Sequence, residues 1–231
     1  LDAGSRRQVA LPRGHVEAGR YWISEETVAE PATLWRRLVD QFPTSGLWPI
    51  LVKPDLLQSS GPWTGENWFV PAESTEVAAV NAEDLLQRRW AELRLPKGDS
   101  APVGEDLTFP SLNLAPVLDP RAGGRYLLVL VPVVRPADSV AAIGWFPPNS
   151  DLSPAQLTSV LRSWEDRYNW VLYVLEPEAM ELTVPPVADE SVYAQMIAEQ
   201  FALAPDYLLG EVTISQLLEA PVDPTAYLAW Q

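Results

Sequence analysis

Residues 153–206 constrain the fold more than any other stretch, because their pattern is typical of a helix, two strands and a second helix. Ser153 is a favoured N-cap, Pro154 suits the first helical position, and Gln156 stands where a capping box needs an amide or a carboxylate. The apolar residues that follow recur at helical spacing and predict one buried stripe: Leu157, Leu161, Trp164 and Tyr168. Asn169 is expected to end this helix.

Two strands are predicted after this helix. WVLYVL at 170–175 contains the β-branched and aromatic residues that suit a pleated, half-buried surface, and MELTV at 180–184 alternates in character. Asp189 is expected to cap the last helix. The buried face of that helix is predicted to carry Tyr193, Met196, Ile197, Phe201 and Ala204. With a further apolar strand at 126–134, the pattern predicts an α+β fold in which helices pack on a mixed β-sheet.

The first part of the chain predicts a smaller α/β lobe alongside this sheet. Residues 1–20 contain four arginines and are expected to be a loosely ordered lead-in. A short strand is predicted at 21–23 and a helix at 31–42, which the Pro-Thr-Ser-Gly turn at 43–46 is expected to stop. A second amphipathic helix, capped by an asparagine, is predicted at 81–93.

The strand LWPILV, predicted at 47–52, contains a proline. Because Pro49 has no N–H to donate to a ladder, we expect an edge strand or a bulge there. Prolines and a Gly-Gly turn crowd the segment that follows the predicted lobe. We therefore predict an N-terminal lobe at 1–95, a Pro-rich linker or inter-lobe loop at 96–123, and a C-terminal α+β lobe at 124–231.

Composition excludes several classes of function. The formal net charge of −15 argues against nucleic-acid binding, in which Lys and Arg neutralise the phosphates. The chain has no cysteine and one histidine, so thiolate chemistry, a two-histidine metal site and a Ser-His-Asp triad lack support. No phosphate-binding glycine motif is present, and no cofactor or metal is predicted. No membrane-length apolar run or apolar signal core occurs, which favours a cytoplasmic location.

One candidate binding residue lies on a Gly/Pro-rich loop. Glu66 stands between Trp63 and Trp68. Aromatic neighbours raise the pKa of a carboxyl group and prepare it for acid–base work. The same residues also suit a sugar- or peptide-binding platform, or a packed loop with no binding role.

The two predicted C-terminal helices supply further candidates. Helical geometry places Glu165 and Arg167 on opposite flanks of the apolar stripe, where either would line a groove against the N-terminal lobe. The alternative there is a surface ion pair between Arg162 and Asp166. Gln200 lies within the apolar face of the last helix, where it either faces a polar cleft or forms hydrogen bonds inside the core.

Several segments together resemble a bacterial, actinobacterial-type family, the domain-of-unknown-function 4253 family. The similar segments are GLWPILV (46–52), W-x-x-GE (63–66), FPSLNLAP (109–116), VPVVRPAD (131–138), IGW (143–145), LRSWEDRY (161–168) and AEQFALAPD (198–206). The family pattern has His at the position of Gln200 and Cys at that of Ala204. A His/Cys pair one turn apart would suit a metal or nucleophile site, so this chain has either lost that chemistry or uses both positions for the core.

The resemblance implies an accessory protein, with relatives linked to toxin immunity. Together with the charge and ten tryptophans, it predicts a non-catalytic, cytoplasmic, immunity-like protein that binds another, basic protein. The predicted binding residues are Trp63, Glu66, Trp68, Trp145, Glu165, Arg167, Gln200 and Asp206. The alternative is a carboxylate-dependent hydrolase or small-ligand-binding protein that uses Glu66 with Glu165 or Asp206 in a cleft between the lobes. A third hypothesis is that the protein is a structural or virion-type component.

Overall fold

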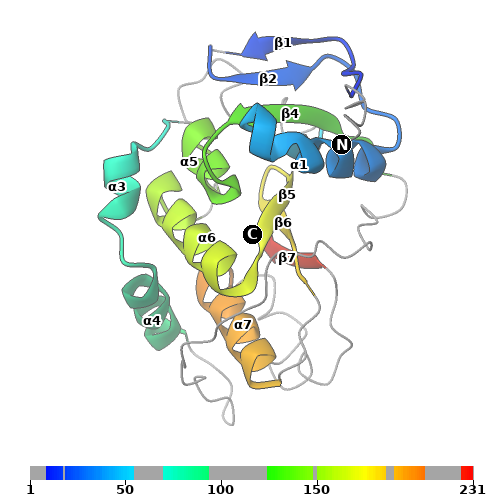
Figure 1. Cartoon of the computed structure of the whole chain (residues 1–231). Coiled ribbons are helices and arrows are strands. Elements are labelled where there is room, and N and C mark those ends of the chain that lie inside the picture. The colour runs from blue at the N-terminus through cyan, green and yellow to red at the C-terminus, as the bar shows by residue number, and fades with distance from the viewer. Residues whose placement is uncertain are drawn as a thin grey trace, which may run out of the picture.

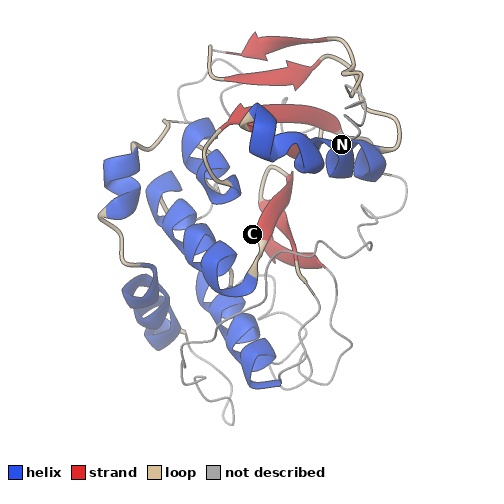
Figure 2. Cartoon of the chain, viewed as in Figure 1, coloured by secondary structure: helices blue, strands red, loops and turns tan. Residues whose placement is uncertain are grey.

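The computed structural model describes residues 9–17, 19–54, 70–93, 124–147, 150–185, 190–205 and 225–230. Their strands are β1 (Gly14–Glu17), β2 (Tyr21–Ser24), β3 (Leu47–Val52), β4 (Leu127–Pro132), β5 (Val171–Leu175), β6 (Ala179–Thr183) and β7 (Thr225–Ala229). The helices are α1 (Pro31–Ser45), α3 (Ser74–Ala78), α4 (Ala82–Glu92), the 3-10 turn η1 (Pro136–Asp138), α5 (Ser139–Ile143), α6 (Pro154–Tyr168) and α7 (Glu190–Leu203). The predicted α+β class is confirmed (Figures 1 and 2).

The strands form one mixed sheet in the order β1-β2-β4-β3-β5-β6-β7. β3 and β5 are parallel, and the other neighbouring pairs are antiparallel. Strands from both sides of the predicted linker therefore share this sheet, and β3 lies between β4 and β5. The linker itself lies outside the described residues, and the division into lobes stays a prediction.

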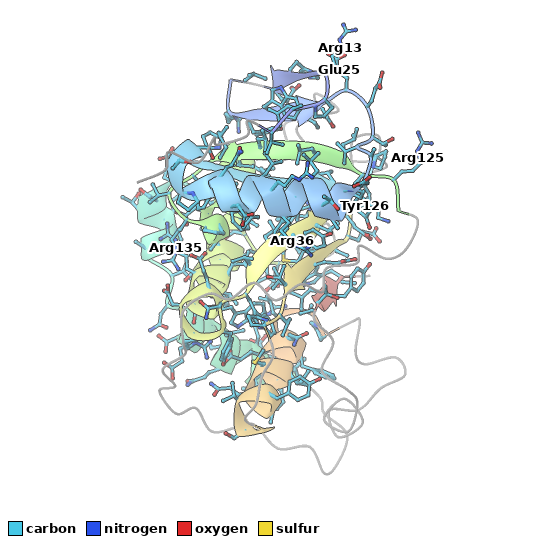
Figure 3. The ribbon with its side chains drawn as sticks, turned by 45° about the vertical axis from the view of Figure 1, so that its right-hand side comes forward. Arg13, Glu25, Arg36, Arg125, Tyr126 and Arg135 are labelled. Carbon is cyan, nitrogen blue, oxygen red and sulfur yellow. The ribbon has the colours of Figure 1, made fainter. Side chains whose placement is uncertain are left out.

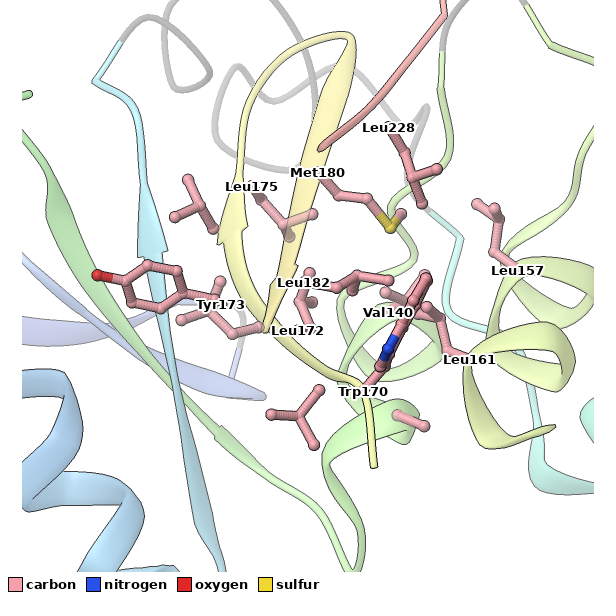
Figure 4. Close-up of a cluster of buried hydrophobic side chains, with 14 of the residues drawn as sticks. Val140, Leu157, Leu161, Trp170, Leu172, Tyr173, Leu175, Met180, Leu182 and Leu228 are labelled. Atoms are coloured by element: carbon pink, nitrogen blue, oxygen red, sulfur yellow. The ribbon is translucent and has the colours of Figure 1, made fainter. Parts of the chain in front are cut away.

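Helices cover both faces of the sheet. On one face, Val140 of α5 and Leu161 of α6 meet Trp170 and Leu182 from the strand region (Figure 4). Tyr173 points to the other face, where its ring lies 4.7 Å from that of Trp35 in α1. α3 and α4 lie outside α6, so α6 is enclosed between the sheet and this outer helical layer (Figure 1).

The predicted signals of α6 are confirmed. The Ser153 hydroxyl accepts from the backbone N–H of Gln156, whose side chain accepts from the N–H of Ser153 in return. Asn169 ends the helix in the left-handed region, at φ 54°. The predicted stripe is buried and includes Trp164, which has no exposed surface. Local capping chemistry and the apolar period therefore agree here.

Two predictions in the first part of the chain are wrong. α1 continues beyond Phe42 to Ser45, and Gly46 ends it at φ 65°, donating its N–H to the carbonyl of Phe42. Pro43 lies in the last turn of α1, where it donates no N–H to the helix, and α1 ends three residues later at Gly46. The lead-in also contains a strand, β1, which pairs with β2 through a turn that includes Gly19 at φ 68°.

The expected edge or bulge at Pro49 is also wrong. β3 is an interior strand that pairs with β4 along its whole length. In the parallel ladder with β5, Leu51 and Val52 pair with Val174 and Leu175, so Pro49 lies outside that ladder. Two indoles supply hydrogen bonds in this region: Trp35 Nε1 donates to the Pro49 carbonyl at 2.8 Å, and Trp48 Nε1 donates to the Leu172 carbonyl at 3.0 Å. Tryptophan side chains thus help a proline fit inside the sheet.

Candidate functional site

Half of the predicted binding residues lie within the described part of the chain. Trp63, Glu66, Trp68 and Asp206 lie outside it. Trp145 is fully buried and packs edge-on against Trp230 at 5.9 Å, so it contributes to the core. Glu165 and Arg167 lie on α6 and Gln200 lies on α7, and their surroundings define what this region can do.

Glu165 lies on the flank of α6 that faces η1. Its Oε2 accepts the backbone N–H of Ala137 at 2.8 Å, and its Oε1 accepts Nε of Arg135 at 3.2 Å. Figure 3 shows where Arg135 lies. Burial raises the pKa of Glu165, while the Ala137 N–H and the charge of Arg135 oppose that rise.

The same flank carries two more ion pairs. NH2 of Arg135 lies 2.6 Å from Oδ1 of Asp166, and Nε of Arg162 lies 2.6 Å from Oδ1 of Asp138. Arg162 and Asp166 therefore pair with residues of the 131–138 motif, and the surface pair considered from the sequence is replaced by contacts between segments. We call the cluster of these ion pairs the η1 clasp; its members are Arg135, Asp138, Arg162, Glu165 and Asp166.

Arg167 lies on the opposite flank and faces α7. Its guanidinium donates to both carboxylate oxygens of Glu199, at 2.7 Å and 2.5 Å. Glu199 also accepts from Trp164 Nε1 at 2.6 Å, from the Tyr168 hydroxyl at 3.0 Å and from Gln195 Nε2 at 3.0 Å. We call these five residues the Glu199 clasp.

The electrostatics of the Glu199 clasp are those of a stable ion pair. Burial disfavours the charged form of Arg167, but the hydrogen bonds and charge of Glu199 outweigh it and raise the pKa of Arg167. Burial and the charge of Glu199 also raise the pKa of Tyr168 far above its ordinary value. The arginine stays charged and the phenol stays protonated, so both remain donors to Glu199 at neutral pH.

Sequence reasoning missed Glu199 although it named both of its neighbours in space and sequence, Arg167 and Gln200. Gln200 is 9% exposed, and its backbone carbonyl accepts the backbone N–H of Ala204. A signal was present: Glu199 lies one turn after Gln195 and directly before Gln200, so it flanks the apolar face. A carboxylate there is expected to find a cation on the neighbouring helix.

Through the two clasps, α6 connects the η1 segment to α7. Through the η1 clasp it holds the VPVVRPAD segment, and through the Glu199 clasp it holds the segment that starts at 198. The VPVVRPAD, LRSWEDRY and AEQFALAPD motifs are therefore joined by side-chain contacts. Most carboxylate oxygens of the clasps already accept hydrogen bonds, which suits fixing a structure more than transferring protons.

The outer side of α3 and α4 is acidic. Its exposed carboxylates, called the α3–α4 acidic face, are Glu73, Glu76, Glu83, Asp84 and Glu92. Glu76 closes a capping box with Glu73, and Glu83 and Asp84 lie in the first turn of α4, where negative charge favours the helix. They stabilise these short helices while giving the surface its charge. Arg88 is exposed beside them.

A second polar group lies where the parallel strands β3 and β5 end. Lys53 Nζ lies 3.8 Å from Oε1 of Glu176 and 4.6 Å from the ring centroid of Tyr126. The Tyr227 hydroxyl lies 3.2 Å from Oε2 of Glu176, and Glu181 is buried on β6. Burial raises the pKa of Tyr126, with Lys53 opposing and Glu181 adding to the rise. We call these five residues the Lys53 cluster.

Within the described ranges, no group of three or more His, Asp or Glu side chains is arranged to hold a metal ion. The helices of the same ranges include none that is long and apolar enough to cross a membrane.

Fold and clasps define an α+β domain built around α6. Residues 127–231 match the family model described as "Domain of unknown function (DUF4253)". The resemblance predicted from the motifs is thereby confirmed. The segments at 46–52, 63–66 and 109–116 precede the matched region. Neither the curated proteins nor the solved structures compared with the chain include a match.

Proposed function

We propose that this protein is a non-catalytic binding protein that engages a basic partner protein through the α3–α4 acidic face. The observation that carries the proposal is the distribution of charge. The chain has a net charge of −15, and the described carboxylates of the two clasps are paired, whereas those of α3 and α4 face solvent. Complementary charge steers association and selects partners.

The support beneath this face favours recognition. α3 packs on α6, and α4 packs on both α6 and α7. Arg89 of α4 donates to the Ala202 carbonyl at 2.9 Å, which ties the acidic helix to α7. A surface held on rigid elements loses less entropy on binding. An immunity-like role, in which the acidic face covers a basic surface of a toxin, is one form of this function.

The test is affinity capture from the native host, followed by identification of the partner and measurement of the binary Kd. The face variant Glu76→Gln, Glu83→Gln, Asp84→Asn and Glu92→Gln is compared with wild type. The control variant Glu17→Gln, Glu25→Gln, Asp40→Asn and Glu178→Gln removes the same charge from other sites. We expect the face variant to bind more weakly by about tenfold or more and the control to change little, because close charges matter more than net charge.

Two results would count against the proposal. The first is equal loss of affinity in both variants, which would make binding a non-specific effect of net charge. The second is a captured partner whose Kd does not change with ionic strength.

A second candidate function, small-ligand binding, is supported by the position of the Lys53 cluster. Lys53 and Glu176 directly follow the parallel strands β3 and β5, and open sheets bind ligands at the carboxyl ends of their parallel strands. The test is a thermal-shift screen of small carboxylic acids and amines on wild type and Lys53→Met. A compound that stabilises wild type alone supports the site, and compounds that stabilise both proteins equally refute it.

A further inference from the structure

A hollow of about 370 Å³ lies between the segment before β1 and the start of α1. It is lined on one side by Leu11, on the other by Glu26 and Val28, and along α1 by Glu30, Leu34 and Arg37. We call it the α1 hollow. It lies in the N-terminal part of the chain, far in sequence from the Glu199 clasp and the residues matched by the family model.

The walls of the hollow are fixed by hydrogen bonds. The buried Ser24 hydroxyl donates to the Glu26 carbonyl and accepts the N–H of Leu128, both at 2.9 Å. The Val28 N–H donates to the Tyr126 carbonyl at 2.8 Å. Arg13 and Glu25 form an ion pair at 2.8 Å, and Figure 3 shows where both residues lie. The wall at residues 26–28 is therefore held in place by contacts within the fold.

Part of its lining is aliphatic. Val28 and Leu34 are half-buried against the core, and Leu11 is 44% exposed at the rim. A large aliphatic side chain at the rim of a fixed hollow gains from being covered, by about 25 cal/mol per Å² of apolar area removed from water. This aliphatic part of the lining therefore favours an occupant with an aliphatic side chain.

Opposite charges stand at the two ends of the hollow. Glu30 is exposed at the N-cap of α1, Glu26 is exposed in the segment between β2 and α1, and Arg37 is exposed further along the helix. Glu30 and Arg37 are seven positions apart, which corresponds to about 10 Å along a helix axis. An extended peptide rises about 3.3 Å per residue, so the same distance spans about three residues.

We propose that the α1 hollow binds an extended peptide segment of a partner protein in which a lysine or arginine and an acidic residue stand three positions apart, with an aliphatic side chain between them. The basic side chain faces Glu26 and Glu30, the acidic one faces Arg37, and the aliphatic one covers Leu11 and Leu34. This site is separate from the α3–α4 acidic face and does not depend on it.

The probe is the peptide acetyl-Lys-Leu-Val-Glu-amide, titrated at millimolar concentration while the methyl resonances of Leu11, Val28 and Leu34 are recorded by NMR. We expect saturable shifts of these methyl groups. Glu30→Gln and Arg37→Gln should each weaken binding by about two- to fivefold, the range for exposed ion pairs. The control peptide acetyl-Gln-Leu-Val-Gln-amide should bind more weakly and should lose nothing further in either variant.

The face variant of α3 and α4 serves as the matched protein control. It should bind the peptide as wild type does, so failure of the hollow and failure of the proposed function are distinguishable. Absence of methyl shifts at saturating peptide would overturn the inference. Equal binding of the charged and uncharged peptides would also overturn it, because the charges at the two ends would then select nothing.

Discussion

Replacing Glu199 tests whether the Glu199 clasp holds α6 to α7. Glu199→Met removes the acceptor of five hydrogen bonds while keeping a long side chain. The side chains of Arg167 and Glu199 are 30% and 12% exposed, so this ion pair is largely buried. Breaking a buried pair from one side leaves a charge without its partner and costs about 3–5 kcal/mol.

The magnitude follows from the exposure of each partner. Because Arg167 retains some contact with water, we take the lower part of the 3–5 kcal/mol range as the cost of leaving it without Glu199, about 3 kcal/mol. Trp164 also loses its acceptor while fully buried, which costs about 1–3 kcal/mol. These terms are not additive, and we expect Glu199→Met to lower the free energy of unfolding by about 4 kcal/mol.

The matched variants complete a double-mutant cycle. Arg167→Met should cost about 2 kcal/mol, because Glu199 keeps its other donors. The double variant should be more stable than the sum of the single effects predicts, by about 2 kcal/mol, since two apolar side chains replace a broken ion pair. The assay is guanidinium denaturation followed by far-UV circular dichroism. A coupling energy near zero would refute the interpretation of these residues as one unit.

Two further predictions concern pH and backbone geometry. Burial raises the pKa of Glu165 in the folded state, so the protonated form is favoured there. The free energy of unfolding of wild type should therefore fall relative to that of Glu165→Gln as the pH rises above 4.5, the ordinary pKa of a glutamate side chain. Denaturation at several pH values checks this, and a difference between the two proteins that does not change with pH contradicts it. Gly144→Ala should cost more than Gly46→Ala, which should lose about 1–2 kcal/mol from its left-handed φ alone. A Cβ at Gly144 would also stand 2.7 Å from the backbone of Val70, whereas one at Gly46 meets nothing within 4 Å, so equal melting temperatures would contradict the clash.

The order of elements in the C-terminal part was predictable because each has a local signal. The capping box at Ser153, the left-handed Asn169 and the apolar period between them need no distant partner. β5 and β6 follow from composition in the same way. Strand neighbours were not predictable, since the position of β3 between β4 and β5 depends on contacts far apart in sequence.

Proline was misread for the same reason. From sequence, Pro49 argues for a sheet edge, because it lacks an N–H. In the folded protein β3 is interior, but its ladder with β5 involves only Leu51 and Val52, so Pro49 needs no N–H for that ladder. Its carbonyl receives the indole N–H of Trp35, and no local rule contains either contact. The tryptophans were likewise interpreted as recognition residues, but Trp35, Trp145, Trp164, Trp170 and Trp230 are buried in the core.

The candidate site was predictable in part. Opposite flanks for Glu165 and Arg167 follow from helical geometry, and both side chains lie there. Their partners, Arg135 and Glu199, come from segments about thirty positions away in sequence, so only the fold identifies them. The predicted roles of Glu165, Arg167 and Gln200 in binding stay predictions.

We attribute partner binding to the exposed carboxylates of α3 and α4. Carbodiimide footprinting with mass spectrometry, applied to the free protein and to its complex with the captured partner, measures the accessibility of each carboxylate directly. We expect protection in the complex of Glu76, Glu83, Asp84 and Glu92, while Asp40 and Glu178 react as before. Unchanged labelling of α3 and α4 in a saturated complex would contradict it.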